Sequence, residues 1–291
     1  MNFTYFRDTK VGVQLVVLLL GCLLMTIISS SLMLLAGSAG VDIHDTTNIL
    51  WFQLGSQVLS FLLTSLLFVW VFYGNVTSYL RLDFSLQQWG RGGVAVIILL
   101  LLLPVIDWVT VWNDGMHLPQ SLSSLEDLMR SVSAQSEQLL NGLLTTTDPA
   151  RLALNLLVIA LCPAICEEVF FRGVLQQVLS RWFKNPHWAI IVAAAVFSVV
   201  HGEVFAFVPR FLLGVVLGYL FYLSGSLLVN VCAHFVNNAL IVVLYFLYSG
   251  GTLAVSPDEP IALPWLPTLL CVVAAACLFY IYFVKKRSST R

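Results

Sequence analysis

Two adjacent carboxylates and an arginine interrupt a mostly apolar stretch of this sequence. They are Glu167, Glu168 and Arg172, and two later apolar stretches carry His201 and His234. Ionisable side chains are costly in hydrocarbon, so inside a membrane they usually mark a functional site. Carboxylates and imidazoles are also common carriers of protons in general acid–base chemistry. The sequence therefore predicts a polar site for proton-transfer chemistry within a membrane.

The spacing of the charged residues divides them into two groups. Glu168 and Arg172 are one helical turn apart, so they can form an ion pair that lowers the cost of burying both. Glu167 is rotated from Glu168 by about 100° on a helix of 3.6 residues per turn. We therefore expect Glu167 to face elsewhere and to be the free carboxylate.

The depths of the polar residues along their segments are similar. Glu167 and His201 each lie fourteen residues from the predicted inner end of an apolar segment. At about 1.5 Å per residue, both would be roughly 21 Å from that end. His234 and Asn238 lie one turn apart on a third segment, at roughly 12 and 18 Å. These depths predict that three helices bring polar groups together, although each group alone could be a helix-packing hydrogen bond.

The composition indicates that most of the chain lies in a membrane. The 291 residues are 59% hydrophobic and 10% charged, against about 25% charged in soluble domains, and the mean hydropathy is +0.92. We predict an all-α fold, a polytopic bundle of about eight transmembrane helices in a single domain over residues 1–291. The helix centres are expected near Leu23, Leu62, Leu102, Leu161, Ala194, Val216, Ala239 and Ala275. The first apolar run is too long for a signal peptide and should remain as an anchor.

Residues 119–147 form the one long polar stretch, and their pattern predicts an amphipathic helix at the outer membrane interface. Leucines recur there at helical spacing, and Ser123 with Glu126 matches a capping box. Such a helix either caps the bundle or gates access to it.

All six cysteines lie in apolar segments, which predicts free thiols, with metal ligation by the neighbouring Cys162 and Cys166 as the alternative.

The basic residues favour one orientation of the bundle. Eleven of the 14 Lys and Arg residues fall on one side of an eight-span arrangement if both termini are cytoplasmic. They are Arg7, Lys10, Arg81, Arg91, Arg172, Arg181, Lys184, Lys285, Lys286, Arg287 and Arg291. A bacterial chain of this kind is expected in the inner membrane. The spread of basic residues over several loops and the net charge of −1 argue against a nucleic-acid partner.

The polar residues also fall into three motifs that resemble those of the CPBP (Abi) family of intramembrane proteases. This family includes type II CAAX prenyl endopeptidases and bacterial proteins linked to bacteriocin self-immunity. Its Glu-Glu-x-x-x-Arg motif matches residues 167–172, its Phe-x-x-x-His motif matches Phe197 and His201, and its His-x-x-x-Asn motif matches His234 and Asn238. The motifs occur in order, each on its own predicted span, within a core of about residues 152–244.

The resemblance implies an endopeptidase that hydrolyses a peptide bond of a membrane-associated protein or peptide, prenylated or not, in a cavity within the lipid bilayer. In such an enzyme Glu167 would be the general base that activates water, and His201 would help to hold that water. His234 and Asn238 would donate hydrogen bonds to the oxyanion. Its supporting residues would be Glu168, Arg172 and Phe197.

Two mechanisms are open for such a site. We favour one without metal or other cofactor, because a metal would occupy Glu167 and leave as base Glu168, which is better explained by its pairing with Arg172. The His-Glu-x-x-His zinc helix is also absent from the sequence. The alternative is one divalent metal, zinc above all, held by His201, His234 and Glu167 as a His₂Glu set. Two other functions also stay open, namely a non-catalytic scaffold or immunity protein of the same fold and a transporter with a midplane polar site.

A reporter fused after Arg291 tests the orientation. Because most basic residues fall on one side, we expect an alkaline phosphatase fusion at this position to be inactive and a fluorescent protein fusion to be bright. A reporter that is exported from this position would overturn the eight-span topology with cytoplasmic termini.

Overall fold

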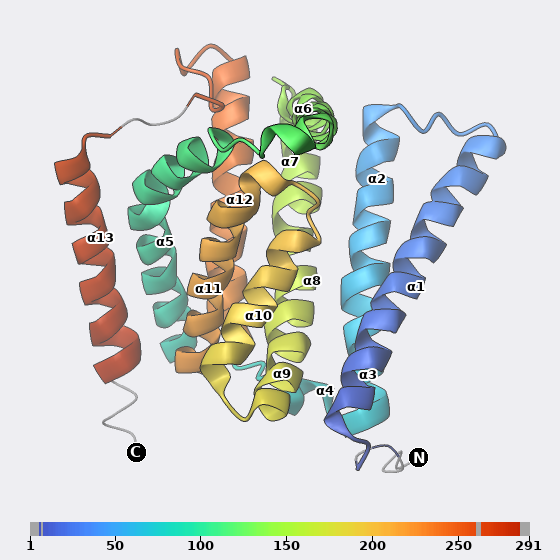
Figure 1. The fold of residues 1–291 in the computed structure, drawn as a ribbon, viewed down its shortest axis with the longest axis vertical. Coiled ribbons are helices and arrows are strands. Elements are labelled where there is room, and N and C mark those ends of the chain that lie inside the picture. Colours follow the sequence, from blue (N-terminus) through green and yellow to red (C-terminus); the bar gives the residue numbers. More distant parts are fainter. Residues whose placement is uncertain (1–5, 7, 260–262, 286–291) are drawn as a thin grey trace.

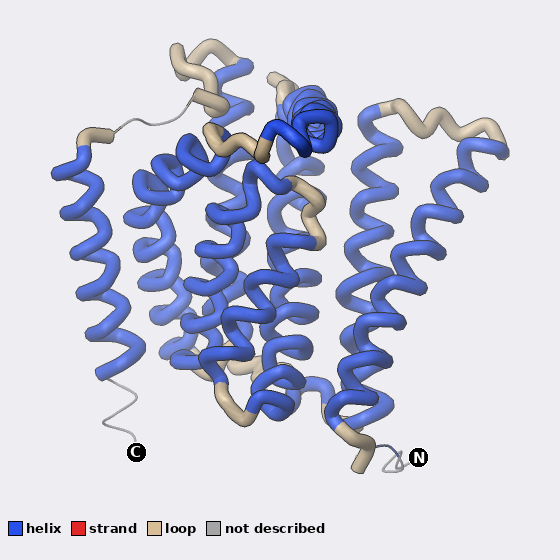
Figure 2. Tube along the Cα trace, viewed as in Figure 1, coloured by secondary structure: helices blue, strands red, loops and turns tan. Residues whose placement is uncertain are grey.

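The chain folds into a bundle of helices. A computed structural model describes residues 6, 8–259 and 263–285, and within them all regular structure is helical, with no strand (Figures 1 and 2). Seven helical segments are long and apolar enough to cross a membrane, and a further apolar helix, α10 (Pro186–Val199), has 14 residues. The predicted all-α polytopic bundle of about eight helices is confirmed, and the chain is an integral membrane protein.

The spans alternate in direction along the chain (Figure 1). The first three are α1 (Val11–Ser38), then α2 (Thr46–Gln57), η2 (Val58–Leu63) and α3 (Thr64–Tyr73) as one continuous helix, and, after the short α4 (Val76–Tyr79), α5 (Leu86–Asp114). The fourth comprises α7 (Pro149–Asn155), η4 (Leu156–Leu161), α8 (Cys162–Glu168), η5 (Val169–Leu175) and α9 (Gln176–Phe183). After α10 and the turn η6 (Val204–Ala206) come α11 (Phe207–Ser224), α12 (Leu227–Ser249), and α13 (Trp265–Phe279) with η7 (Tyr280–Lys285).

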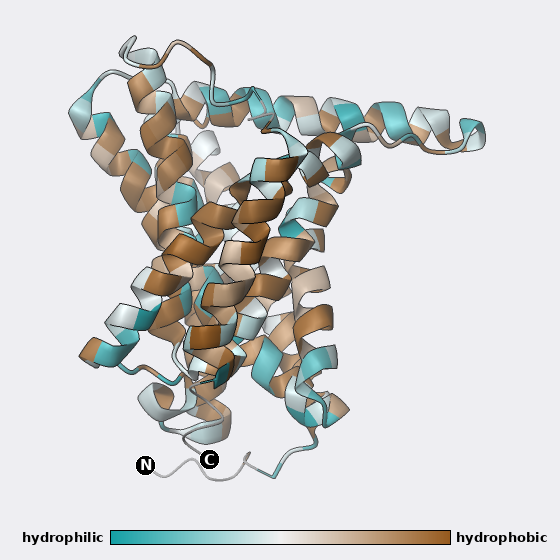
Figure 3. Cartoon of the chain, turned by 90° about the vertical axis from the view of Figure 1, so that its left-hand side faces the viewer, coloured by the Kyte–Doolittle hydropathy of each residue, from teal (hydrophilic) through white to brown (hydrophobic). Residues whose placement is uncertain are grey.

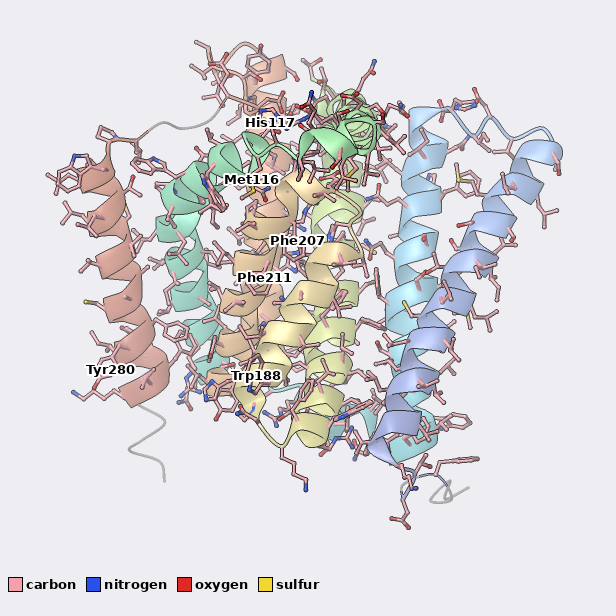
Figure 4. All side chains as sticks on the ribbon, viewed as in Figure 1. Met116, His117, Trp188, Phe207, Phe211 and Tyr280 are labelled. Carbon is pink, nitrogen blue, oxygen red and sulfur yellow. The ribbon has the colours of Figure 1, made fainter. Side chains whose placement is uncertain are left out.

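The first span begins, and the last one ends, at the same end of the bundle (Figure 1). Exposed aromatic side chains lie at this end, where Trp188 and Tyr280 are 61% and 59% exposed (Figure 4). Such aromatic residues are typical of a membrane–water interface. The prediction that Arg172 lies on this side with the other basic residues is wrong, because Arg172 is buried inside the bundle. Arg7, Lys286, Arg287 and Arg291 lie outside the described residues.

The fourth span departs from regular α-helix on both sides of the two glutamates. Pro163 lacks an N–H donor and its ring crowds the carbonyl four residues earlier, and the wide π-helical turn η4 ends just before it. A second π-helical turn, η5, begins directly after Glu168 and contains Arg172. Turns of this kind are common at functional sites in helices. They turn the side chains that follow away from their regular helical directions.

Two glycines let α11 approach α10 closely. A Cβ added at Gly214 would lie 3.0 Å from the Cβ of Ala194, and one added at Gly218 would lie 2.7 Å from Cγ2 of Ile190. Small residues four positions apart are a frequent device for close packing of membrane helices. The close approach also brings the carbonyl of Gly214 within 3.1 Å of the Arg172 guanidinium.

The predicted amphipathic helix is present as α6 (Ser123–Leu144), which crosses the end of the bundle opposite to Trp188 and projects beyond it (Figures 1 and 3). The predicted capping box is wrong. Ser123 is already helical, because the turn η3 (Gln120–Leu122) leads straight into α6, and no side chain caps the helix.

Glu126 instead ties α6 to the loop before it. Its carboxylate accepts hydrogen bonds from the backbone N–H of Leu118 at 2.7 Å and from Nε of Arg130 at 2.9 Å, and Nδ1 of His117 lies 2.8 Å away (Figure 4). The Leu118 N–H, followed by the side chains of Arg130 and His117, lowers the pKa of Glu126 to about 2. The carboxylate is therefore ionised at neutral pH and holds α6 in place.

Candidate active site

Glu168 is the centre of a buried polar cluster. Its side chain is fully buried, and its Oε1 lies 2.7 Å from Nη1 of Arg172 and 2.9 Å from Nδ1 of His234. Its Oε2 accepts a hydrogen bond from Nδ2 of Asn230 at 3.1 Å. The ion pair predicted from the spacing of Glu168 and Arg172 is present. The contacts to His234 and Asn230 join the fourth span to α12.

Arg172 extends the cluster to two further helices. The residue is 1% exposed, and its Nη2 donates to the carbonyl of Gly214 on α11 at 3.1 Å. Its guanidinium carbon lies 4.8 Å from the ring centroid of Phe197 on α10, a cation–π contact. The positive charge of Arg172 thus offsets the negative charge of Glu168. Its hydrogen bond to Gly214 and its contact with the Phe197 ring hold α11 and α10 against the fourth span.

Glu167 has different surroundings from Glu168. It is 5% exposed, its Oε2 lies 3.9 Å from Nε2 of His234, and its Oε1 accepts a hydrogen bond from Nε2 of Gln57 at 3.1 Å. Glu167 thus faces away from the Glu168–Arg172 ion pair, and the neutral amide of Gln57 is its hydrogen-bond partner. The sequence held a signal for this contact: Gln53, Gln57 and Ser60 put a polar face on the second span.

His234 bridges the two glutamates. Because Nδ1 lies 2.9 Å from the Glu168 carboxylate, that nitrogen carries a proton and donates a hydrogen bond to Glu168. This contact turns the ring so that Nε2 faces Glu167. A carboxylate that fixes the tautomer and direction of a histidine is a common arrangement in catalytic sites.

His201 does not lie inside a span as predicted. Helix α10 ends at Val199, and His201 follows in an exposed turn. Its Nδ1 lies 2.7 Å from the carbonyl oxygen of Phe197, so Nδ1 is the donor and a neutral ring keeps its acceptor at Nε2. The Phe197 ring packs against His201 and His234, with centroid distances of 4.9 and 6.2 Å. Phe197 therefore contacts both histidines.

Asn238 lies one turn beyond His234 on α12 and is half-buried. Its Oδ1 accepts a hydrogen bond from Nδ2 of Asn237 at 3.2 Å. With its carbonyl oxygen engaged, the group that Asn238 offers to a bound molecule is its amide NH₂.

A cavity of about 530 Å³ lies between α1, the α2–η2 helix, η5 and α10, and its lining includes Gln57, the partner of Glu167. Its walls are mainly apolar, with Leu19, Phe61, Phe170 and Val196 among them, and Gln57 contributes a polar group. Gln57 thus contacts the cavity and Glu167 together. An apolar molecule that enters from the lipid would meet this amide beside Glu167.

The residues assigned to a His₂Glu metal set are not gathered as a set of ligands. No three His, Cys, Asp or Glu side chains of the described residues are grouped so that they could hold a metal ion. The Sγ atoms of Cys162 and Cys166 lie 3.6 Å apart, and all six cysteines are free thiols. The metal-dependent alternative stays a prediction for direct test.

Replacement of Arg172 tests the buried cluster. Arg172→Ala leaves the Glu168 carboxylate buried without its cation, and we expect a loss of about 3–5 kcal/mol in the free energy of unfolding. Glu168→Gln should also destabilise the protein, because it strands Arg172. Thermal unfolding of the purified protein measures both effects.

Arg151→Ala is the matched control for this experiment. Arg151 lies near the α6 end of the same span and donates to the Thr47 hydroxyl, so its loss should cost no more than about 1 kcal/mol. Wild-type stability of Arg172→Ala would contradict the ion-pair assignment.

One segment of the chain is similar to known proteins. Residues 149–240 match the family model described as type II CAAX prenyl endopeptidase Rce1-like. A stretch of 80 residues is 34% identical to the uncharacterized protein YyaK of Bacillus subtilis (strain 168), and it covers 25% of this chain and 27% of YyaK. No solved structure matches the chain. The polar cluster built around Glu167 and Glu168 therefore lies in an Rce1-like segment, in agreement with the resemblance of its motifs to the CPBP family.

Proposed function

We propose that this protein is an intramembrane endopeptidase that hydrolyses a peptide bond of a membrane-associated protein or peptide. The observation that carries the proposal is the pairing of Glu167 with His234, whose Nε2 and the Oε2 of Glu167 lie 3.9 Å apart in a buried setting. An oxygen placed to one side of this pair can lie about 3 Å from both atoms, within hydrogen-bond reach of each. The Rce1-like match supports a protease-type chain.

Glu167 acts as general base in this mechanism. It takes a proton from a water molecule, whose oxygen attacks the carbonyl carbon of the substrate; the C–N bond then breaks, and the proton passes to the departing amine. The Gln57 amide orients the carboxylate by its hydrogen bond to Oε1 and leaves Oε2 for the water. Glu168 is unsuited to this role, because Arg172, His234 and Asn230 already bind its oxygens.

His234 and Asn238 stabilise the oxyanion that forms on the substrate. A hydrogen bond from Nε2 of His234 requires a proton on both ring nitrogens, with Nδ1 donating to Glu168. Asn238 adds the NH₂ group of its side chain from the same helix face. His201, in its exposed turn, holds the incoming water through Nε2. The apolar walls of the neighbouring cavity suit a lipid-like or hydrophobic portion of the substrate.

Glu167→Gln tests the general base. The substitution keeps the size and hydrogen bonding of the side chain but removes the base, so we expect turnover to fall by roughly 10²–10⁴ while the bundle stays folded. Quantitative proteomics of membrane peptides released by the wild type identifies substrates, and cleavage of one such peptide by purified protein gives the rate. Gln57→Leu should give a smaller loss of roughly fivefold, the value of one hydrogen bond.

Glu137→Gln is the matched control, because Glu137 is an exposed carboxylate on α6, far along the chain from the site. It should leave the rate unchanged. A purified Glu167→Gln protein that cleaves at the wild-type rate would remove the protease mechanism and favour the non-catalytic scaffold.

A chelator distinguishes the two proposed mechanisms. If Glu167 works with the histidines alone, purified protein treated with a strong chelator should retain its activity. Activity that is lost on chelation and recovered on addition of zinc would favour the metal-dependent alternative.

A further inference from the structure

A second cavity, unconnected with the glutamates, lies at the end of the bundle opposite to α6. Its volume is about 330 Å³, within the lower range of small-ligand sites. Side chains from α3, α4, α9, α10 and α11 and from the loop after α4 line it, and none of them is acidic. They are Tyr73, Tyr79, Arg81, Gln176, Gln177, Ser180, Arg181, Pro186, Phe221 and Tyr222. Gln176 follows Glu167 by nine residues, or roughly 14 Å along the helix.

Arg181 is held in this cavity by neutral groups. Its Nη1 donates to the Tyr73 hydroxyl, its Nη2 to the Tyr79 hydroxyl at 3.0 Å, and its Nε to the carbonyl of Gln177 at 3.3 Å. The Tyr73 hydroxyl in turn donates to Oε1 of Gln14 at 2.5 Å. Within the described part of the chain Arg181 has no ion-pair partner. The guanidinium is thus fixed in direction, keeps its full charge and has N–H donors to spare out of five.

A second guanidinium stands near the first. The Cζ atom of Arg81 lies 5.3 Å from the ring centroid of Phe221, and both Arg81 and Arg181 act electrostatically on Tyr79. Burial raises the pKa of Tyr79 well above its usual value, so its hydroxyl stays protonated at neutral pH. Arg81 also has a left-handed backbone with φ of 55°, which is uncommon for a residue other than glycine. Paired guanidinium groups suit the oxygens of a phosphate.

Gln176 closes one side of the cavity next to the two cations. It is 5% exposed, and its Nε2 donates to the carbonyl of Gly218 at 3.0 Å. Its Oε1 is enclosed against Gly218 of α11. The amide therefore holds α9 against α11 beside the cavity.

We propose that this cavity binds the headgroup of an anionic phospholipid, with the phosphate at Arg81 and Arg181. The exposed Trp188, one turn into α10, places this end of the bundle at the level of lipid headgroups. Basic pockets between transmembrane helices are a known kind of headgroup site. The site is independent of the proposed peptidase activity.

Lipid competition on the full-length protein tests the proposal. The protein is placed in nanodiscs with equal amounts of phosphatidylglycerol and phosphatidylcholine, and the lipids that it retains are counted by native mass spectrometry. We expect the ratio of retained phosphatidylglycerol to retained phosphatidylcholine to be about 25 for the wild type, because each of the two arginines should contribute roughly fivefold. Arg181→Gln should lower the ratio about fivefold.

Lys10→Gln is the matched control, because Lys10 is an exposed cation at the same end of the bundle, just before α1, and does not line the cavity. It should leave the ratio unchanged. Equal retention of the two lipids by the wild type would overturn the proposal even if the arginine variants fail to fold. So would a Lys10→Gln effect as large as that of Arg181→Gln.

Inorganic phosphate added to protein in phosphatidylcholine nanodiscs should not raise the unfolding temperature of the protein. Stabilisation by phosphate equal to that by phosphatidylglycerol would overturn the lipid site and show a free-anion site instead.

Discussion

The rest of this site depends on how the bundle buries one carboxylate. A carboxylate in hydrocarbon is tolerated only when cations and hydrogen-bond donors satisfy its oxygens. Glu168 receives Arg172 from its own span and His234 and Asn230 from α12. Arg172 in turn bonds the α11 backbone. These helices cannot shift relative to one another without leaving a buried charge unpaired, so the polar cluster fixes their positions as well as its own.

The same cluster gives two identical neighbouring side chains different chemistry. Glu168 has three donors on its two oxygens. Glu167 has one neutral amide on Oε1, and His234 stands 3.9 Å from Oε2. Environments that separate two carboxylates in this way are how proteins assign distinct roles to residues of one type. Glu168 orients His234, and His234 then faces Glu167, so one glutamate fixes the surroundings of its neighbour.

The sequence predicted the features that arise from local spacing and composition. The helical spans follow from hydropathy, and the Glu168–Arg172 pair follows from a separation of one turn. Contacts between distant segments could not be read in this way: Gln57 and Glu167 are 110 residues apart, and His234 and Glu168 are 66 apart. The position of His201 was wrong for a different reason. The apolar run continues to Val200, but the helix ends at Val199, and Gly202 takes a left-handed conformation with φ of 73° in the turn that follows. Hydropathy reports where a segment prefers to lie and does not report where its helix stops.

Helix α10 is too short to cross a bilayer by itself. Fourteen residues extend about 21 Å, against roughly 30 Å of hydrocarbon, so the chain leaves the helical conformation before it has crossed. Non-helical backbone at this depth is tolerated only when protein buries it or when it lines a water-filled cavity. The hydroxyl of Ser198 donates to the carbonyl of Phe207 at 2.7 Å, which closes the turn on itself, and His201 is exposed within that turn. The break in the span therefore leaves His201 outside the helix, while the Phe197 ring near the end of α10 contacts both His201 and His234. The end of α10 thus connects the exposed histidine to the buried one.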